Sequence, residues 1–402
     1  MTSPDVVVVG GGPAGATVAA LLAGQGRRIL LIDRSPTWRW HACGVFASPA
    51  AVAVLRRVGV DDATLATVRR PIPAMRVEVV GGATFRLTYG DDGSLSRPAV
   101  GFDRRALDEA LLRLAENAGV EVRRGTTLTG LEPGPDRMRL HVREPMGDAR
   151  IATRFVVGAD GVRSTVARVA GVTRRARLGD RVGLTFHVAD PRPTADRDAR
   201  MVVLDGAYCG LAPVPGNRVN VGIVLASPAW RRRLAQEGAA GVATAILRAI
   251  PAAEDDPVNW AAAERLDPIE GASPLGHRVA RRADAGWLLV GDAAGFLDPL
   301  TGEGLHRALV SAEAAATALG AHLDGRDGAL AAYDRHMTRR FRSKDAVTNL
   351  IQSFLDRPVL LHRAASRLAR SDSLRETMGL VIGDLAPATR ALEPGFLARL
   401  LL

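Results

Sequence analysis

The stretch DVVVVGGGPAGATVAALLAGQGRRILLID, from Asp5 to Asp33, decides the fold. The β-branched run Val6–Val9 is typical of a buried parallel strand, and the uncharged stretch Ala14–Ala23 predicts a helix. Residues 28–32 predict a second strand, which ends at Asp33. A strand, a glycine-rich turn, a helix and a second strand in this order form a βαβ unit. The sequence therefore predicts a Rossmann-type parallel sheet.

Gly10, Gly12 and Gly15 form a G-x-G-x-x-G turn between the first strand and the helix. At such a turn a pyrophosphate can lie on backbone N–H groups, where the helix dipole favours negative charge. Gly12 lets the backbone approach the phosphate, and Gly15 lets the helix pack closely on the strand. Asp33 is placed to accept a hydrogen bond from an adenosine ribose hydroxyl. The turn predicts a dinucleotide site, in which we also include Pro13, Ala14 and Arg34.

Beyond this unit the chain predicts a Rossmann-type domain that is interrupted by antiparallel β material. Helices are expected at residues 49–57, 102–120, 230–250 and 304–319, and alternating stretches between 179 and 275 predict an antiparallel sheet. We expect an α/β protein with three parts. These are a discontinuous cofactor-binding domain of residues 1–75, 98–178 and 277–332, an inserted substrate-binding domain of residues 76–97 and 179–276, and a helical C-terminal region of residues 333–402.

The composition narrows the classes of partner. The net charge is +10, and all but one of the 53 basic residues are arginines, Lys344 being the exception. The arginines are scattered in pairs and no nucleic-acid-binding motif accompanies them, so we expect no nucleic-acid partner; an acidic carrier protein remains an alternative. Two cysteines are too few for a disulfide framework. The run from Val6 to Gly24 is interrupted by glycines, and no other segment has the length of a membrane span, which predicts a cytoplasmic protein.

Two further patterns follow apolar strands: GADGVRS at residues 158–164 and GDAAG at residues 291–295. With the glycine turn in front of them, they resemble the motifs of the glutathione-reductase-type FAD-binding flavoproteins. This group contains the group A aromatic hydroxylases, the flavin-dependent halogenases and the geranylgeranyl reductases. The resemblance covers about Asp5 to Leu319 and implies FAD as the cofactor, with NAD(P)H as a transient reductant.

The resemblance also implies roles for individual residues. Asp292 would hold the ribityl chain, Arg104 would contact the pyrophosphate or ribityl region, and Asp160 would lie near FAD and the route of the nicotinamide donor. In PLTGEGLHRAL, residues 299–309, a helix N-terminus would face flavin N1 and C2=O, where negative charge collects on reduction. His306 is expected on the helix surface. The implied cofactor site further contains Cys43, Gly44, Leu128, Gly161, Gly291, Pro299, Gly302, Glu303, Gly304 and Leu305.

The segment WRWHACG, residues 38–44, contains one of the two cysteines. His41 and Cys43 supply only two of the four ligands that a structural zinc site needs, so no metal site is predicted. Nothing local supports a dithiol pair with Cys209. The segment resembles the cysteine-glycine pair that borders the flavin in geranylgeranyl reductases. We therefore interpret Cys43-Gly44 as active-site lining, with Trp38 and Trp40 packed around the cofactor or its entrance; a plain core cysteine is the alternative.

The predicted strand YCGLAP, residues 208–213, distinguishes between the enzyme classes of this group, because each class has its own motif there. Halogenases carry Trp-X-Trp-X-Ile-Pro there and a lysine near the substrate, whereas both tryptophans are missing here and Lys344 lies far downstream. Geranylgeranyl reductases carry Tyr-X-Trp-X-Phe-Pro, of which Tyr208 and Pro213 remain. Gly210 and Ala212 replace the two aromatic residues and predict a wider pocket. We expect the pocket to be lined by Cys43, Tyr208, Gly210, Ala212, Pro213 and Pro299.

The preferred hypothesis is an FAD-dependent monooxygenase of secondary metabolism. It would use NAD(P)H and O2 to oxygenate a bulky hydrophobic or polycyclic small molecule through a flavin C4a-hydroperoxide. The alternatives are a geranylgeranyl reductase-like enzyme that reduces carbon-carbon double bonds and a non-catalytic flavin-binding scaffold. No catalytic side chain is assigned, because in each enzyme the flavin carries the chemistry.

Overall fold

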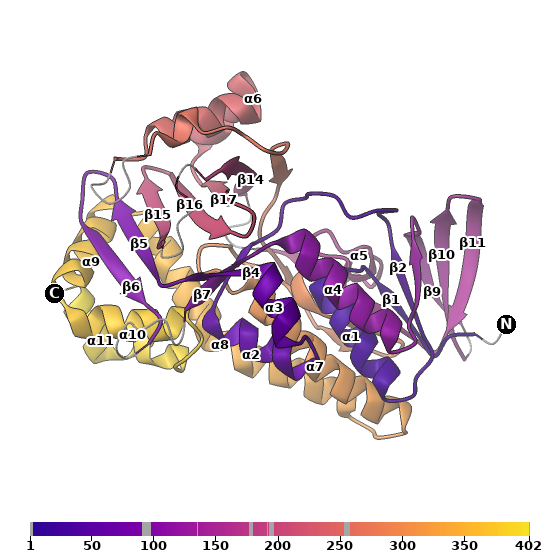
Figure 1. The fold of residues 1–402 in the computed structure, drawn as a ribbon. Coiled ribbons are helices and arrows are strands. Elements are labelled where there is room, and N and C mark those ends of the chain that lie inside the picture. Colours follow the sequence, from indigo (N-terminus) through magenta and orange to yellow (C-terminus); the bar gives the residue numbers. More distant parts are fainter. Residues whose placement is uncertain are drawn as a thin grey trace.

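The computed structural model describes residues 3–90, 98–134, 136–176, 180–190, 192, 197–252 and 258–401. A six-stranded sheet in the order β20-β21-β12-β1-β2-β8 forms one half of the molecule (Figure 1). All neighbours pair in parallel except β20 and β21. Its strands are β1 (Val6–Val9), β2 (Ile29–Asp33), β8 (Glu121–Arg124), β12 (Phe155–Gly158), β20 (Ala283–Asp284) and β21 (Trp287–Leu289).

Both faces of this sheet are covered, which explains why its central strands are continuous apolar runs. Val6 and Val8 pack into a helical layer, and Val7 and Val9 face the opposite side. The helical layer consists of α1 (Pro13–Gly24), α2 (Pro49–Arg57), α3 (Asp62–Val68), α4 (Arg104–Asn117) and α7 (Gly304–Leu323). The other face is covered by α5 (Thr165–Val169) and by a sheet of β9 (Thr127–Pro133), β10 (Met138–Glu144) and β11 (Gly147–Thr153).

A second sheet of seven strands has the order β18-β14-β17-β16-β15-β5-β6. Its pairings are antiparallel except that between β15 and β5. The strands are β5 (Ala74–Val79), β6 (Thr84–Thr88), β14 (Val182–Ala189), β15 (Ala199–Leu204), β16 (Ala207–Val214), β17 (Arg218–Leu225) and β18 (Glu270–Ala272). The excursion near residue 76 and the inserted segment after residue 179 therefore share one sheet.

The two faces of the second sheet meet different partners. Cys209 and Leu211 point into a core beneath α6 (Pro228–Arg248), whereas Tyr208 packs against the C-terminal helices. The sequence predicted one continuous helix near residues 230–250. The structure corrects this prediction, because Gly238 has a φ of +71° and breaks α6 into two parts.

The remaining elements are short. The strands β3 (Phe46–Ala47), β4 (Arg69–Ile72) and β7 (Ala99–Phe102) form a small sheet, and β13 (Thr173–Arg175) pairs with β19 (His277–Val279). The 3-10 turns are η1 (Trp260–Ala262), η2 (Gly291–Ala294) and η3 (Ala388–Leu392). In β7, a Cβ atom on Gly101 would lie 1.9 Å from the carbonyl oxygen of Pro213 in β16. Glycine at this position therefore allows the small sheet to touch the large one.

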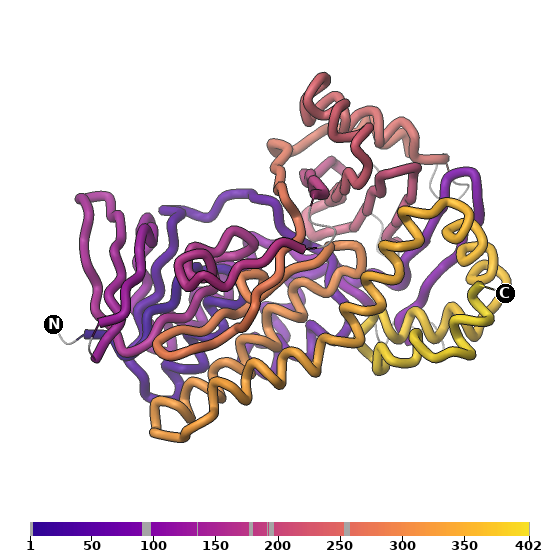
Figure 2. The backbone as a smooth tube through the Cα atoms, turned by 180° about the vertical axis from the view of Figure 1, so that it is seen from behind, coloured from indigo at the N-terminus to yellow at the C-terminus, as the bar shows by residue number. Residues whose placement is uncertain are grey.

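Helices α8 (Ala329–Leu355), α9 (Pro358–Arg370), α10 (Asp372–Ile382) and α11 (Pro394–Leu401) complete the chain. Figure 2 shows the tube passing from α7 and α8 into the C-terminal helices, which lie beside β5 and β6. A Cβ atom on Gly379 would lie 2.0 Å from the carbonyl oxygen of Thr88, so α10 packs directly on β6.

The α/β class with an inserted β sheet and a helical C-terminal region is confirmed. Within the described ranges, no helix is both long enough and apolar enough to cross a bilayer. The same part of the chain contains no group of three or more His, Cys, Asp or Glu side chains arranged to hold a metal ion.

Candidate functional site

The three glycines of the first turn have two different roles. Gly10 has a φ of +106°, and a Cβ atom there would lie 2.4 Å from the carbonyl oxygen of Ala159. A Cβ atom on Gly15 would lie 1.9 Å from the carbonyl oxygen of Gly10. Around Gly12, by contrast, a Cβ atom would meet nothing within 4 Å. Gly10 and Gly15 thus permit close packing, and Gly12 leaves open space in front of α1 that a phosphate group fits.

The backbone N–H groups at the start of α1 and of α7 have no side-chain cap. Elsewhere Asp61 and Asp103 cap α3 and α4 through their carboxylates. The first N–H groups of a helix need an acceptor from outside the helix, and an anion can supply it. The uncapped ends of α1 and α7 are therefore suited to the pyrophosphate and the flavin ring of FAD.

Asp33 holds the first turn in place. Its Oδ2 accepts the N–H of Gly11 at 2.7 Å and its Oδ1 accepts the N–H of Ser35 at 2.8 Å. Each oxygen keeps a further lone pair, so a ribose hydroxyl still finds an acceptor there. The neighbouring Arg34 is exposed.

Arg104 is only 8% exposed, although it lies in the first turn of α4. Its Nε and Nη2 donate to the carboxylate of Asp108 at 3.0 and 3.1 Å, and its Nη1 donates to the carbonyl oxygen of Gly44 at 2.8 Å. Asp108 also accepts a hydrogen bond of 3.3 Å from Trp38 Nε1. Arg104 and Asp108 therefore hold the Cys43-Gly44 segment against α4.

Cys43 has an unreactive thiol. Burial raises its pKa to about 12, so the sulfur stays protonated at neutral pH. Because the thiolate is the nucleophile and the metal ligand, this environment does not suit dithiol exchange or metal binding. A buried, protonated thiol of this kind is compatible with the predicted role of Cys43 as part of the apolar lining of the active site.

Trp40 connects the same segment to the second sheet. Its ring centroid lies 4.3 Å from that of His187 in β14, and its Nε1 donates to the carbonyl oxygen of Thr185 at 3.3 Å. His187 is fixed in turn by Asp267, whose Oδ2 lies 2.6 Å from its Nδ1.

Asp160 lies at the start of α5. Its Oδ2 accepts the N–H groups of Thr165 and Val166 at 2.6 and 3.3 Å. Its Oδ1 is buried and accepts no hydrogen bond from the described part of the chain. The adjacent Gly161 has a φ of +77°, which glycine adopts without strain.

The carboxylate of Asp292, in η2 directly after Gly291, makes no hydrogen bond or ion pair to any described residue. Burial raises its pKa to about 6, in spite of the opposing charges of Arg104 and Arg307. A carboxyl group without a protein partner fits the hydroxyl groups of a ribityl chain, which is the role that the sequence predicts.

We expect the substitution Asp292→Asn to stabilise the protein without cofactor and to weaken FAD binding. The pKa of the carboxyl group lies above its ordinary value of 3.8, so the folded state binds the proton more tightly than the unfolded state does. The free energy of unfolding therefore falls as pH rises from about 4 to 6, by up to about 3 kcal/mol. Urea titrations of the cofactor-free protein at pH 5 and pH 7 should show the larger gain for the variant at pH 7. An equal gain at both values would contradict this charge-based explanation.

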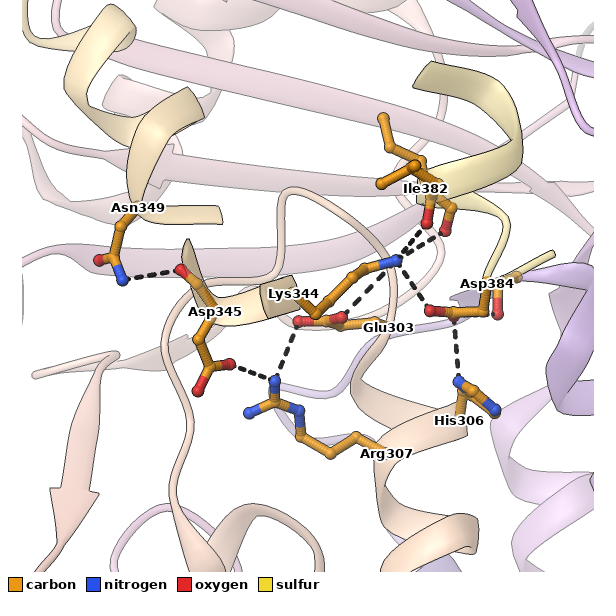
Figure 3. Close-up of polar contacts among 10 residues, drawn as sticks. Glu303, His306, Arg307, Lys344, Asp345, Asn349, Ile382 and Asp384 are labelled. Carbon is orange, nitrogen blue, oxygen red and sulfur yellow. Dashed lines mark hydrogen bonds and ion pairs between the residues drawn. The ribbon is translucent and has the colours of Figure 1, made fainter. Parts of the chain in front are cut away.

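The turn before α7 is packed against the segment that follows Cys43-Gly44. Gly302 has a φ of +64°, and a Cβ atom there would lie 2.3 Å from Cδ1 of Phe46. Glu303 is buried, Gly304 begins α7, and Leu305 packs into the core beneath the helical layer. The sequence placed His306 on the helix surface, and this prediction is wrong. His306 is buried, because α8 and the end of α10 cover this side of α7 (Figure 3).

The predicted substrate-lining residues of β16 contact other segments at both ends of the strand. The Tyr208 hydroxyl donates to the carboxylate of Asp298, whose Oδ1 also accepts the N–H of Leu300 at 2.9 Å. This carboxylate joins β16 to the loop that carries the exposed Pro299. At the other end of the strand, Ala212 packs in a cluster with Val45, Trp40 and Phe46.

Gly210 lies beside a methionine of the neighbouring strand. Gly210 is half-buried, and a Cβ atom there would lie 3.5 Å from Cε of Met201 on the neighbouring strand β15. Met201 therefore occupies part of the room that the missing aromatic side chain leaves. Cys209 points to the opposite face of the sheet.

The structure brings the segments at residues 43–46, 208–213 and 298–305 together through these contacts. Leu128, which the sequence assigned to the cofactor site, instead has its side chain in the core beneath the sheet of β9, β10 and β11 and not at an open surface. Asp108, Met201, Asp298 and Asp384 also lie in this region, although no site was predicted at them from the sequence. Lys344 could have been noticed as the single lysine of an arginine-rich chain.

Comparison with known proteins agrees with this geometry. Residues 3–349 match the protein family described as FAD binding domain. A menaquinone reductase of Mycobacterium tuberculosis (strain H37Rv) is 30% identical over 343 residues, which are 81% of this chain and 78% of that protein. Digeranylgeranylglycerophospholipid reductase 2 of Methanothermobacter thermautotrophicus is 28% identical over 347 residues, 80% of each chain.

The crystal structure of a flavoprotein/dehydrogenase from Cytophaga hutchinsonii has the same fold, with a TM-score of 0.81 at 18% identity over 95% of this chain and 93% of that one. The uncapped helix ends, the open space at Gly12 and the unpartnered Asp292 all fit FAD. The chain belongs to the FAD-binding-domain family of flavin-dependent oxidoreductases.

Proposed function

We propose that this protein reduces a carbon-carbon double bond in an apolar, isoprenoid-type chain, with electrons that come from NAD(P)H. The observation that carries the proposal is the 30% identity to menaquinone reductase over 81% of the chain. The contacts of the Cys43-Gly44 segment add to it, because Phe46, two residues on, lies against Gly302 in the turn before α7.

The residues of this chain would bind and orient the reactants. The N-termini of α1 and α7 would hold the pyrophosphate and the ring of FAD, and Asp292 would hold its ribityl chain. FAD, when bound and reduced, supplies a hydride to one carbon of the double bond, and a proton completes the other. The Tyr208–Asp298 hydrogen bond fixes the loop at Pro299, and Met201 and Ala212 give the pocket an apolar wall.

The position of Met201 favours double-bond reduction over monooxygenation. The monooxygenase hypothesis rested on a pocket widened at Gly210 and Ala212. Because Met201 fills part of the gap at Gly210, the pocket again suits a slender chain. Oxygenation of a bulky substrate with NAD(P)H and O2 remains the second candidate, since no aromatic side chain stands at either position.

The two candidates differ in their need for oxygen. The purified holoprotein should be reduced with dithionite without air and mixed with a menaquinone that carries an unsaturated side chain. Because dithionite also reduces the quinone ring, the product is re-oxidised to the quinone before analysis. The proposal then expects a quinone that is two mass units heavier, with NADH or NADPH able to replace dithionite. An oxygenated product that appears only with O2, and that carries the label of heavy O2, would instead establish the monooxygenase.

A tryptophan at position 210 tests the pocket assignment. We expect Gly210→Trp to lower kcat/KM for the chain substrate at least tenfold, because the indole must displace Met201 from the pocket wall. The bound FAD and its absorbance should be retained, since Gly210 lies on the second sheet. Thr84→Trp, on the exposed side of β6 in the same sheet, is the matched control and should turn over normally. Normal turnover by Gly210→Trp would show that this face does not line the pocket.

A further inference from the structure

Lys344, the single lysine of the chain, lies in α8 and is only 5% exposed. Its Nζ donates to the carbonyl oxygens of Val381 and Ile382 at 2.6 and 3.2 Å and to Oδ1 of Asp384 at 2.8 Å. It also lies 3.8 Å from Oε2 of Glu303 (Figure 3). A buried ammonium group is thus held between the end of α10 and the turn that precedes α7.

Asp384 joins four elements through one carboxylate. It follows α10 and has a φ of +58°, a left-handed conformation that is uncommon for residues other than glycine. Its Oδ2 accepts the hydroxyl of Ser48, which precedes α2, at 2.8 Å. The same oxygen lies 3.0 Å from Nδ1 of His306 in α7. The Ser48 hydroxyl is therefore used to tie α2 to α10 and does not cap its own helix.

Glu303 stands directly before α7, where the sequence places the flavin. Its Oε1 lies 3.4 Å from Nη2 of Arg307, and Arg307 also forms an ion pair with Asp345 of α8. The carboxylates of Glu303, Asp345 and Asp384 thus share the ammonium of Lys344 and the guanidinium of Arg307. Loss of either cation would make the charge before the N-terminus of α7 more negative. Buried charges act on one another strongly, because little water screens them.

We propose that Lys344 and Asp384 are positioning residues that set how strongly the N-terminus of α7 favours reduced over oxidised FAD. Reduction adds negative charge to the flavin, and a positive charge nearby stabilises it. Lys344 supplies such a charge and Asp384 offsets it. This gives the C-terminal helices, which the sequence left without a role, a function in the cofactor site. The inference depends on FAD lying against residues 302–305, and not on the substrate that the flavin reduces.

The test compares two charge changes of opposite sign. In Lys344→Met the reduced form of FAD should lose about tenfold in affinity relative to the oxidised form, which for two electrons is a potential about 30 mV more negative. Asp384→Asn should shift the potential in the positive direction. Asparagine also adopts the left-handed backbone conformation that position 384 needs. Both potentials are measured by dye-coupled titration of the holoprotein.

A purely structural role predicts a different result. It would weaken the binding of oxidised and reduced FAD by the same factor in both variants, and would leave the potential unchanged. Arg340→Met removes a positive charge from an exposed position on α8 and is the matched control, with an expected shift near zero. Lys344→Arg should keep the wild-type potential, since the charge remains.

Shifts of the same sign in Lys344→Met and Asp384→Asn, or no shift in either, would overturn the proposal. Should Lys344→Met fail to fold, Asp384→Asn decides alone, and a potential that does not rise is then the contradicting result. The substrate assay is independent of this test. A wild-type protein that binds FAD but reduces no double bond refutes the proposed function and leaves this inference standing.

Discussion

Replacing Gly12 with glutamate should give a folded protein that has lost its yellow colour. A side chain at position 12 meets no protein atom within 4 Å, so the chain can fold around it. The added carboxylate would stand at the N-terminus of α1, where the helix dipole favours negative charge and stabilises the cofactor-free protein by about 0.3–1 kcal/mol. The same carboxylate would occupy the place of the pyrophosphate and repel its negative charge. We expect FAD affinity to fall at least 100-fold, or about 2.8 kcal/mol.

Gly24→Glu is the matched control for this variant. Gly24 is the last residue of the same helix and is exposed, and a Cβ atom there would also meet nothing within 4 Å. This control should bind FAD as the wild-type chain does. Titration of both cofactor-free variants with FAD, followed by flavin fluorescence, together with circular dichroism, separates binding from folding. A Gly12→Glu protein that remains yellow would refute the placement of the pyrophosphate at this turn.

Replacing Gly15 with alanine should affect folding and not primarily FAD binding. We expect it to destabilise the protein with or without FAD. The new methyl group would lie 1.9 Å from the carbonyl oxygen of Gly10, which is backbone and cannot rotate away. Either α1 or the turn must move, and we expect a loss of about 3 kcal/mol in the free energy of unfolding.

Gly24→Ala places the same methyl group at the end of the same helix, where it meets nothing. It should be neutral or stabilise the chain by about 0.4–1 kcal/mol, because alanine restricts the unfolded chain. Urea denaturation of the cofactor-free proteins compares the two substitutions. A Gly15→Ala protein as stable as Gly24→Ala would show that the helix and strand do not approach as closely as described.

The fold was largely predictable from the sequence, because its signals are local. The βαβ unit of residues 5–33 has an apolar strand, a glycine turn and an uncharged helix within 29 residues. Each of these patterns reflects burial or backbone conformation of neighbouring residues, and tertiary contacts did not change them. The break of α6 at Gly238 was missed because a single glycine within a helical pattern is compatible with a continuous helix.

The candidate site was predictable only in part. The glycines and Asp292 follow motifs, but the contact of Arg104 with the carbonyl oxygen of Gly44 and the contact of Met201 with Gly210 do not. Two residues at register positions of adjacent strands meet only once those strands are paired, and no pattern within β15 predicts that Met201 faces Gly210. The sequence therefore predicted the width of the pocket from the missing side chains of one strand alone, without the contribution of Met201.

By itself, the sequence determined the class of fold, FAD as the cofactor and the close packing of the first glycine turn, because strand burial, helix periodicity and glycine conformation are properties of short segments. Only the tertiary structure decided what surrounds α7. It buried His306, and it brought Lys344, Asp384 and Ser48 into one charged network although Ser48 and Asp384 are 336 residues apart in the chain. Charged groups interact through space, so their partners depend on how distant segments pack and not on their spacing along the chain.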